Sequence, residues 1–127
     1  MAYEITIQVG QTCYYGELNQ SPEAEQVWNA LPLTGDSNVW GDEIYFAIPV
    51  TMDETSEARE IVDVGTVAYW PPGQALCIFY GPTPVSRDER PRAYSPVNIL
   101  GTIGGDLNSL KAVTSGTPVV VTAGHQK

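Results

Sequence analysis

Basic residues and histidine are scarce in this 127-residue chain, and both shortages exclude classes of function. Six lysines and arginines stand against fifteen aspartates and glutamates, giving a formal net charge of -9. Phosphate backbones and anionic lipid surfaces repel such a chain, so we expect no nucleic-acid partner and no membrane partner. The single histidine, His125, lies near the C-terminus, which argues against histidine-dependent triads and multi-histidine metal sites. We therefore expect no metal and no cofactor.

Cysteine and long apolar runs are also rare. The two cysteines, Cys13 and Cys77, lie in separate apolar segments, which favours reduced core thiols over a disulfide. No window approaches the roughly 20 apolar residues of a membrane span. The opening MAYEITIQVG alternates polar and apolar residues and shows no secretory signal. These features predict a cytoplasmic protein with a single domain over residues 1–127.

Alternating apolar residues predict mostly strands. Residues 75–80 are apolar on both faces, as expected of a central or barrel strand. About seven or eight short strands emerge from the whole chain, and their regular spacing favours a closed barrel or a sandwich. The clearest of them cover residues 3–9, 12–17, 43–48, 67–69, 75–80, 97–103 and 118–123.

Two short helices complete the predicted elements. Ser21-Pro22-Glu23 offers a hydroxyl N-cap, a proline at the first helical position and an acid in the first turn. Ala24, Val27, Trp28 and Leu31 follow at the spacing of one helical face, and Pro32 ends it. Asp106 can begin a second helical turn. The acidic segment 52–60 predicts a solvated loop or turn, with a cation site as the alternative.

The stretch VAYWPPGQALCIFYGPTP, residues 67–84, joins two apolar strands through a proline-rich corner. Pro82 and Pro84 cannot donate to a ladder, so the chain must leave the sheet there. The following loop, SRDERPR, holds three of the six basic residues and is the one locally basic segment.

Three segments together resemble the cyclophilin-like domain family of small bacterial and archaeal proteins: GDEIYFAIPV, VGTVAYWPPGQALCIFYGPTP and SPVNILGTIGGDLNSLKAV. The resemblance runs over nearly the whole chain. It implies a mainly β fold, a closed antiparallel eight-stranded barrel with one or two short helices, which agrees with the strand count.

Cyclophilins proper are prolyl isomerases, and the resemblance allows their catalytic positions to be checked. Their arginine, preceded by a histidine, lies on a strand that ends in isoleucine-proline, with a phenylalanine and a glutamine beyond. Aligning that strand end on Ile48-Pro49 puts Tyr45 at the histidine position and Phe46 at the arginine position. Thr51 and Glu54 stand where the phenylalanine and the glutamine belong. Loss of one preorganised donor commonly costs about 10² to 10³ in rate, so we expect a poor isomerase and assign no catalytic residue.

The resemblance also implies an aromatic substrate groove. Tyrosine and tryptophan combine an apolar body with one polar group, as in many recognition pockets. The alternative is that these aromatics fill the core, which we favour for Phe79 and leave open for Trp70. The candidate ligand-binding residues are Tyr45, Phe46, Tyr69, Trp70, Phe79, Arg90, Arg92 and Asn98.

Three functions follow as hypotheses. The first is a non-catalytic module that binds a small molecule or an extended peptide in the aromatic groove. The second is a weak or divergent prolyl isomerase, in which Arg90 or Arg92 supplies the missing donor if its loop closes over the groove. The third is a structural role. The sequence also leaves open a homodimer formed through an aromatic patch, and it names no ligand.

Overall fold

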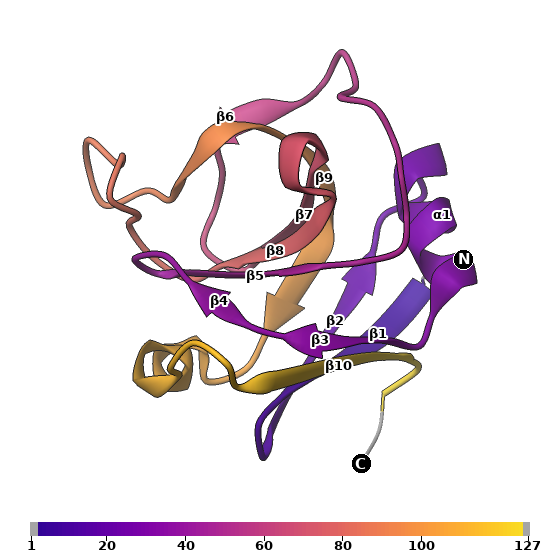
Figure 1. Ribbon diagram of the computed structural model, residues 1–127, viewed down its shortest axis with the longest axis horizontal. Helices are drawn as coiled ribbons and strands as arrows, with labels where there is room; N and C mark the ends of the chain where they lie inside the picture. The colour runs from indigo at the N-terminus through magenta and orange to yellow at the C-terminus, as the bar shows by residue number, and fades with distance from the viewer. Residues whose placement is uncertain (1–2, 126–127) are drawn as a thin grey trace.

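The computed structural model describes residues 3–125, which form an antiparallel β structure with one α-helix and two short 3-10 helices (Figure 1). In chain order the elements are β1 (Tyr3–Val9), β2 (Thr12–Leu18), α1 (Pro22–Ala30), β3 (Leu33–Asp36), β4 (Asn38–Val39), β5 (Glu43–Ala47), β6 (Arg59–Ile61), β7 (Thr66–Trp70), η1 (Pro71–Gly73), β8 (Ala75–Phe79), β9 (Arg92–Gly104), η2 (Leu107–Ala112) and β10 (Pro118–Ala123).

The ten strands of the described chain form a sheet in the order β3-β10-β1-β2-β9-β7-β8-β5-β4, and β6 pairs only with β9. The expected closed eight-stranded barrel is therefore wrong in closure and in strand number. The two edge strands, β3 and β4, follow each other in sequence with only Ser37 between them. One linking residue cannot form a hairpin, so the two edges are joined by the chain itself and not by a ladder.

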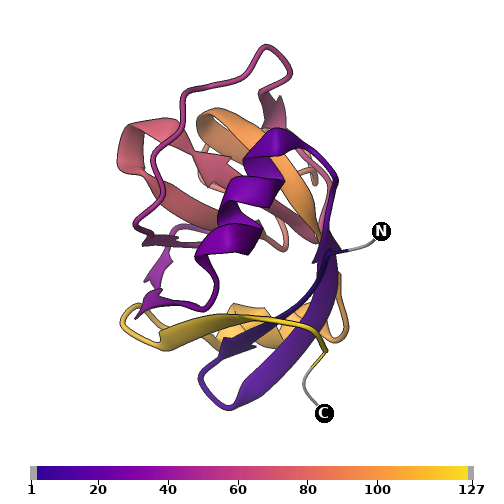
Figure 2. The same cartoon turned by 90° about the vertical axis from the view of Figure 1, so that its right-hand side faces the viewer.

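The predicted helix forms where its cap residues place it. Ser21 is the N-cap, its hydroxyl accepts a hydrogen bond from the Ala24 amide at 3.1 Å, and Pro22 begins the helix. Ala24 and Val27 are buried in the core. Trp28 stacks on Tyr3 with ring centroids 4.8 Å apart. Figure 2 shows α1 lying in front of the curled sheet. Among the described residues, no helix is long and apolar enough to cross a membrane.

Two apolar clusters lie on opposite faces of β7, β8 and β5. Alternate residues of β8 divide between them: Leu76 and Ile78 belong to the main core inside the curled sheet, while Cys77 and Phe79 belong to a smaller cluster on the outer face. This confirms that β8 is apolar on both faces. The remaining buried members of the outer cluster are Val62, Ala68, Ala93 and Val97.

The outer cluster is covered by the first half of β9. From Asn98 onward β9 pairs with β7, whereas Arg92 and Val97 pair with β6. Pro96 lies in the irregular part of the β6 pairing, between Arg92 and Val97, and has no amide hydrogen to donate; the partner changes just after it, between Val97 and Asn98. Residues 92–97 and β6 therefore form an arm over the outer face of the sheet (Figure 1).

Candidate functional site

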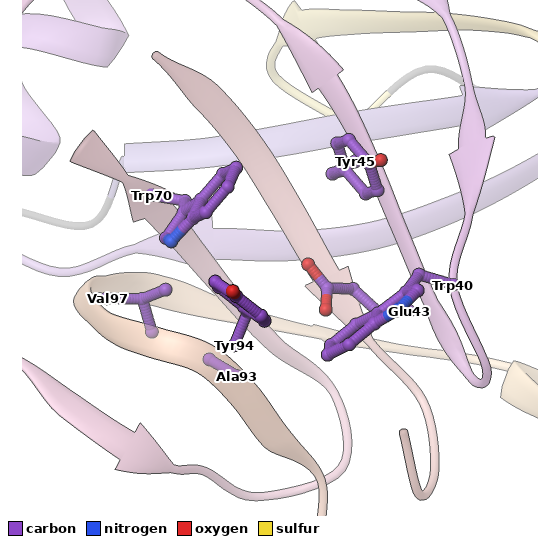
Figure 3. A pocket seen from close by; sticks show the side chains of 7 residues that line it. All are labelled: Trp40, Glu43, Tyr45, Trp70, Ala93, Tyr94 and Val97. Carbon is purple, nitrogen blue, oxygen red and sulfur yellow. The ribbon is translucent and has the colours of Figure 1, made fainter. Parts of the chain in front are cut away.

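A cavity of about 200 Å³ lies between this arm and the outer face of the sheet. Four aromatic side chains and one carboxylate surround it, and all of them come from β5, β7, β9 and the β4–β5 turn (Figure 3). The lining residues are Trp40, Glu43, Tyr45, Trp70, Ala93, Tyr94 and Val97.

A two-residue hairpin places Trp40 and Glu43 side by side. Trp40 and Glu43 exchange backbone hydrogen bonds of 2.9 and 3.2 Å across the β4–β5 turn. Gly41 has φ +59°, as the first central residue of a type II′ turn requires. Residues directly opposite in a hairpin project to the same face, so the indole and the carboxylate both reach the outer face.

Tyr45 joins them because it lies two residues after Glu43 on β5 and so projects to the same face. The cavity exists because the row beside Tyr45 is made of small side chains. Tyr45 is paired with Cys77 on β8, and Cys77 with Ala68 on β7. Neither side chain fills the space between the Tyr45 and Trp70 rings, whose centroids are 6.5 Å apart.

Trp70 is held in place from two sides. Its indole N–H donates a hydrogen bond to the Ser95 hydroxyl at 2.7 Å. Its ring also lies against Gly73 of η1, where an added Cβ would come within 2.5 Å of Cε3 and Cζ3. The absence of a side chain at Gly73 is therefore what lets the proline-rich corner fold beneath the indole.

Tyr94 forms the outer wall of the cavity. Its side chain is 71% exposed, although it contacts two other rings. The Trp40 and Trp70 centroids lie 6.1 and 6.2 Å from it, with interplanar angles of 74° and 89°. A tyrosine this exposed gains less from burial than a core aromatic does.

Glu43 is the one buried acidic side chain among the described residues, with 6% exposure. Desolvation raises its pKa from the ordinary 4.5 to about 7, and a hydrogen bond with the Cys77 thiol opposes this more weakly. No basic side chain within residues 3–125 pairs with it. The ion pairs found there are Arg90–Asp88, Arg92–Glu60, Lys111–Asp42 and His125–Glu4.

Two of the eight candidate residues, Tyr45 and Trp70, line this cavity. The three other aromatic candidates lie in the apolar clusters instead. Phe46 is fully buried and packs against Gly35, and Phe79 is fully buried in the outer cluster. Tyr69 points into the main core, where its hydroxyl donates to the Val50 carbonyl at 2.7 Å.

The polar candidates have other partners. Asn98 is buried; its side chain accepts from the Thr55 amide at 2.9 Å and donates to the Asp53 carbonyl at 3.0 Å, which anchors the acidic loop. Arg90 is exposed and pairs with Asp88 at 2.8 Å. Arg92 pairs with Glu60 at 2.8 Å. Neither arginine lines the cavity.

Sequence reasoning missed Trp40, Glu43 and Tyr94. A signal for the first two was present, because Gly41-Asp42 between two apolar runs is a hairpin turn that sets its flanking residues side by side. Tyr94 had no such signal, since its place depends on the bend of β9. Within residues 3–125, no three histidine, cysteine or acidic side chains form a group that could hold a metal ion.

Comparison with known proteins identifies the family. A search of the curated proteins gave no match. The chain is similar to the hypothetical protein AF2241 from Archaeoglobus fulgidus, known from a solution structure, with 36% sequence identity and a TM-score of 0.79 over 97% of this chain and 95% of that one. A family model described as Cyclophilin-like matches residues 3–122. The chain therefore belongs to the cyclophilin-like family.

Proposed function

We propose that the protein is a non-catalytic binding module whose outer cavity holds a small organic ligand or one side chain of an extended peptide. The observation that carries this proposal is the set of four aromatic rings around the cavity: Trp40, Tyr45, Trp70 and Tyr94. Aromatic side chains supply large contact areas at low conformational cost, and convergent rings with one polar group are typical of ligand pockets.

The size of the cavity limits the ligand. Pockets for drug-sized molecules measure roughly 300–1,000 Å³. At about 200 Å³ this cavity accepts a smaller group, with the remainder of a larger ligand extending past Tyr94 into solvent. A cavity of this volume suits a small molecule or a single peptide side chain.

The alternative, a weak prolyl isomerase, has less support. Lowering the barrier to amide rotation needs a preorganised donor near the proline nitrogen. Phe46 is buried in the main core, and Arg90 and Arg92 are engaged by carboxylates away from the cavity. The lining residues that carry a side-chain donor are two tyrosines and two tryptophans, and the Trp70 N–H is already bonded to Ser95.

Tryptophan fluorescence tests the binding proposal, because two of the three tryptophans line the cavity and Trp28 does not. In a Trp28→Phe background, emission comes from Trp40 and Trp70 alone. A ligand found by thermal-shift screening should change this emission and bind at least about tenfold more weakly to Trp70→Ala. Trp28→Phe alone should bind it normally. Ligands that bind Trp70→Ala unchanged would refute the cavity as the site.

A further inference from the structure

The aromatic rings around the cavity lie steeply inclined to one another and are not stacked. Tyr94 meets Trp40 at 74° and Trp70 at 89°, and Tyr45 meets Trp70 at 68°. Neighbouring rings at near right angles form adjacent sides of a box. In such T-shaped pairs no parallel ring covers the ring faces, and ring faces carry the negative part of the aromatic quadrupole.

A carboxylate completes the box. Figure 3 shows the Glu43 side chain reaching in among Trp40, Tyr45 and Tyr94, with its two oxygens toward the space between the rings. Lys111 reaches this turn, but its ammonium pairs with Asp42 at 3.4 Å. Within the described chain, then, the Glu43 charge has no cationic partner of its own.

Ring faces and a carboxylate attract the same kind of ligand. A cation over an aromatic face is attracted by the ring quadrupole, more strongly as the site is desolvated, while a carboxylate adds a direct ion pair. An anion is repelled by both. The formal net charge of -9 also draws cations toward the protein.

We propose that the ligand of this cavity is an organic monocation, an inference that rests on the proposed function. Its alkylated ammonium head sits among Trp40, Tyr94 and Trp70 and pairs with Glu43. Small cations of this type reach a cavity of about 200 Å³ either as free molecules or as an alkylated lysine side chain. The shared chemistry is the ammonium head.

Binding of such a cation should depend on pH through Glu43. The titratable and charged groups on the elements around Glu43 are Cys77 of β8, Tyr80 just after it, Tyr45 of β5, Tyr94 and the Arg92–Glu60 pair of the arm, and Asp42 of the turn with its partner Lys111 of η2. Burial raises the pKa of Cys77, and burial with nearby acids raises that of Tyr80 to about 12, so both stay neutral near pH 7.

Glu43 itself ionises in the physiological range, because burial raises its pKa to about 7. A cation binds the ionised form, so its affinity follows the ionised fraction of Glu43. That fraction rises roughly thirtyfold between pH 5.5 and pH 8 for a pKa near 7, and cation affinity should rise by up to this factor.

The test uses a matched pair of ligands. Choline and 3,3-dimethylbutan-1-ol have the same shape, but the second has carbon in place of the charged nitrogen. Calorimetric or NMR titration at pH 8 should show choline binding at least about tenfold more tightly than the alcohol. In Glu43→Gln this preference should fall severalfold, to the part that the ring faces alone supply, while alcohol binding persists. A peptide with one trimethyllysine, titrated in parallel, shows by its affinity relative to choline which source of the cation fits better.

Three results would overturn the proposal: equal binding of the two isosteres, tighter binding of the alcohol, or no binding of choline and of the peptide. In each case a neutral ligand that still changes Trp40 and Trp70 emission would leave the proposed binding function standing. Failure of every screened ligand to do so would remove both. Trp28→Phe serves as the control variant, since Trp28 stacks on Tyr3 and does not line the cavity.

Discussion

Glu43→Gln should stabilise the protein at neutral and alkaline pH. Glutamine keeps the size of the side chain and its hydrogen-bonding ability, but it does not titrate. Glu43 is almost fully buried without a basic partner among residues 3–125, and desolvation raises its pKa from 4.5 to about 7. The folded protein therefore holds this proton more tightly than the unfolded chain does.

The sign and the size of the effect follow from proton linkage. Because the folded state binds more protons than the unfolded state between pH 4.5 and 7, the free energy of unfolding falls as pH rises through that window. One pKa unit corresponds to 1.36 kcal/mol, so the full cost at high pH is about 3 kcal/mol. Between pH 5 and pH 8 the difference between Glu43→Gln and wild type should grow by about 2.5 kcal/mol in favour of the variant.

Urea unfolding followed by tryptophan fluorescence at constant ionic strength measures this difference at each pH. Glu54→Gln is the matched control, because Glu54 is an exposed glutamate of the acidic loop, and its difference from wild type should stay flat. A Glu43→Gln difference that stays constant between pH 5 and 8, or that shrinks, would refute the reasoning. It would mean that Glu43 is ionised at little cost in the folded protein.

Three further outcomes are expected. Gly73→Ala should displace the Trp70 indole, since its Cβ would come within 2.5 Å of the ring. We expect the free energy of unfolding to fall by about 1–3 kcal/mol and ligand binding to be lost. Gly104→Ala is the control: nothing lies within 4 Å of its added Cβ, so neither stability nor binding should change in the same assays. Ser21→Ala removes the helix cap and should lower urea stability by about 1 kcal/mol without altering cavity fluorescence. Exchange NMR on X-Pro peptides, with a true cyclophilin as positive control, should show no acceleration; catalysis would contradict the non-catalytic proposal.

The long strands and the helix could be predicted because their signals are local. The cap at Ser21, the alternation in β1 and β5, and the doubly apolar β8 all fix an element within a few residues of sequence. The short strands β4 and β6 have two and three residues, too few for alternation to show. The prediction of a closed barrel was wrong for a related reason. Closure depends on whether the two edge strands pair with each other, and a family resemblance does not specify that.

The site was harder to predict because it depends on the bend of β9. Tyr45 and Trp70 could be found from residue type, but so could Tyr69 and Phe79, which face the main core and the outer cluster. The sequence alone does not show which face of β7 the arm covers. Only the change of partner near Pro96, from β6 to β7, brings Tyr94 opposite Trp40 and makes a cavity from residues about fifty positions apart.

Under the proposed function, the cost of burying Glu43 serves cation binding. A glutamine would fill its place without the cost of about 3 kcal/mol that burial imposes on the carboxylate at high pH. Groups that cost folding stability are frequent in binding and catalytic sites, where the missing partner arrives with the ligand. A bound cation would supply that partner and lower the Glu43 pKa. The ion pair with a bound cation would then offset the folding free energy that desolvation of the Glu43 carboxylate costs in the empty cavity. Ligand binding would therefore raise the stability of the fold.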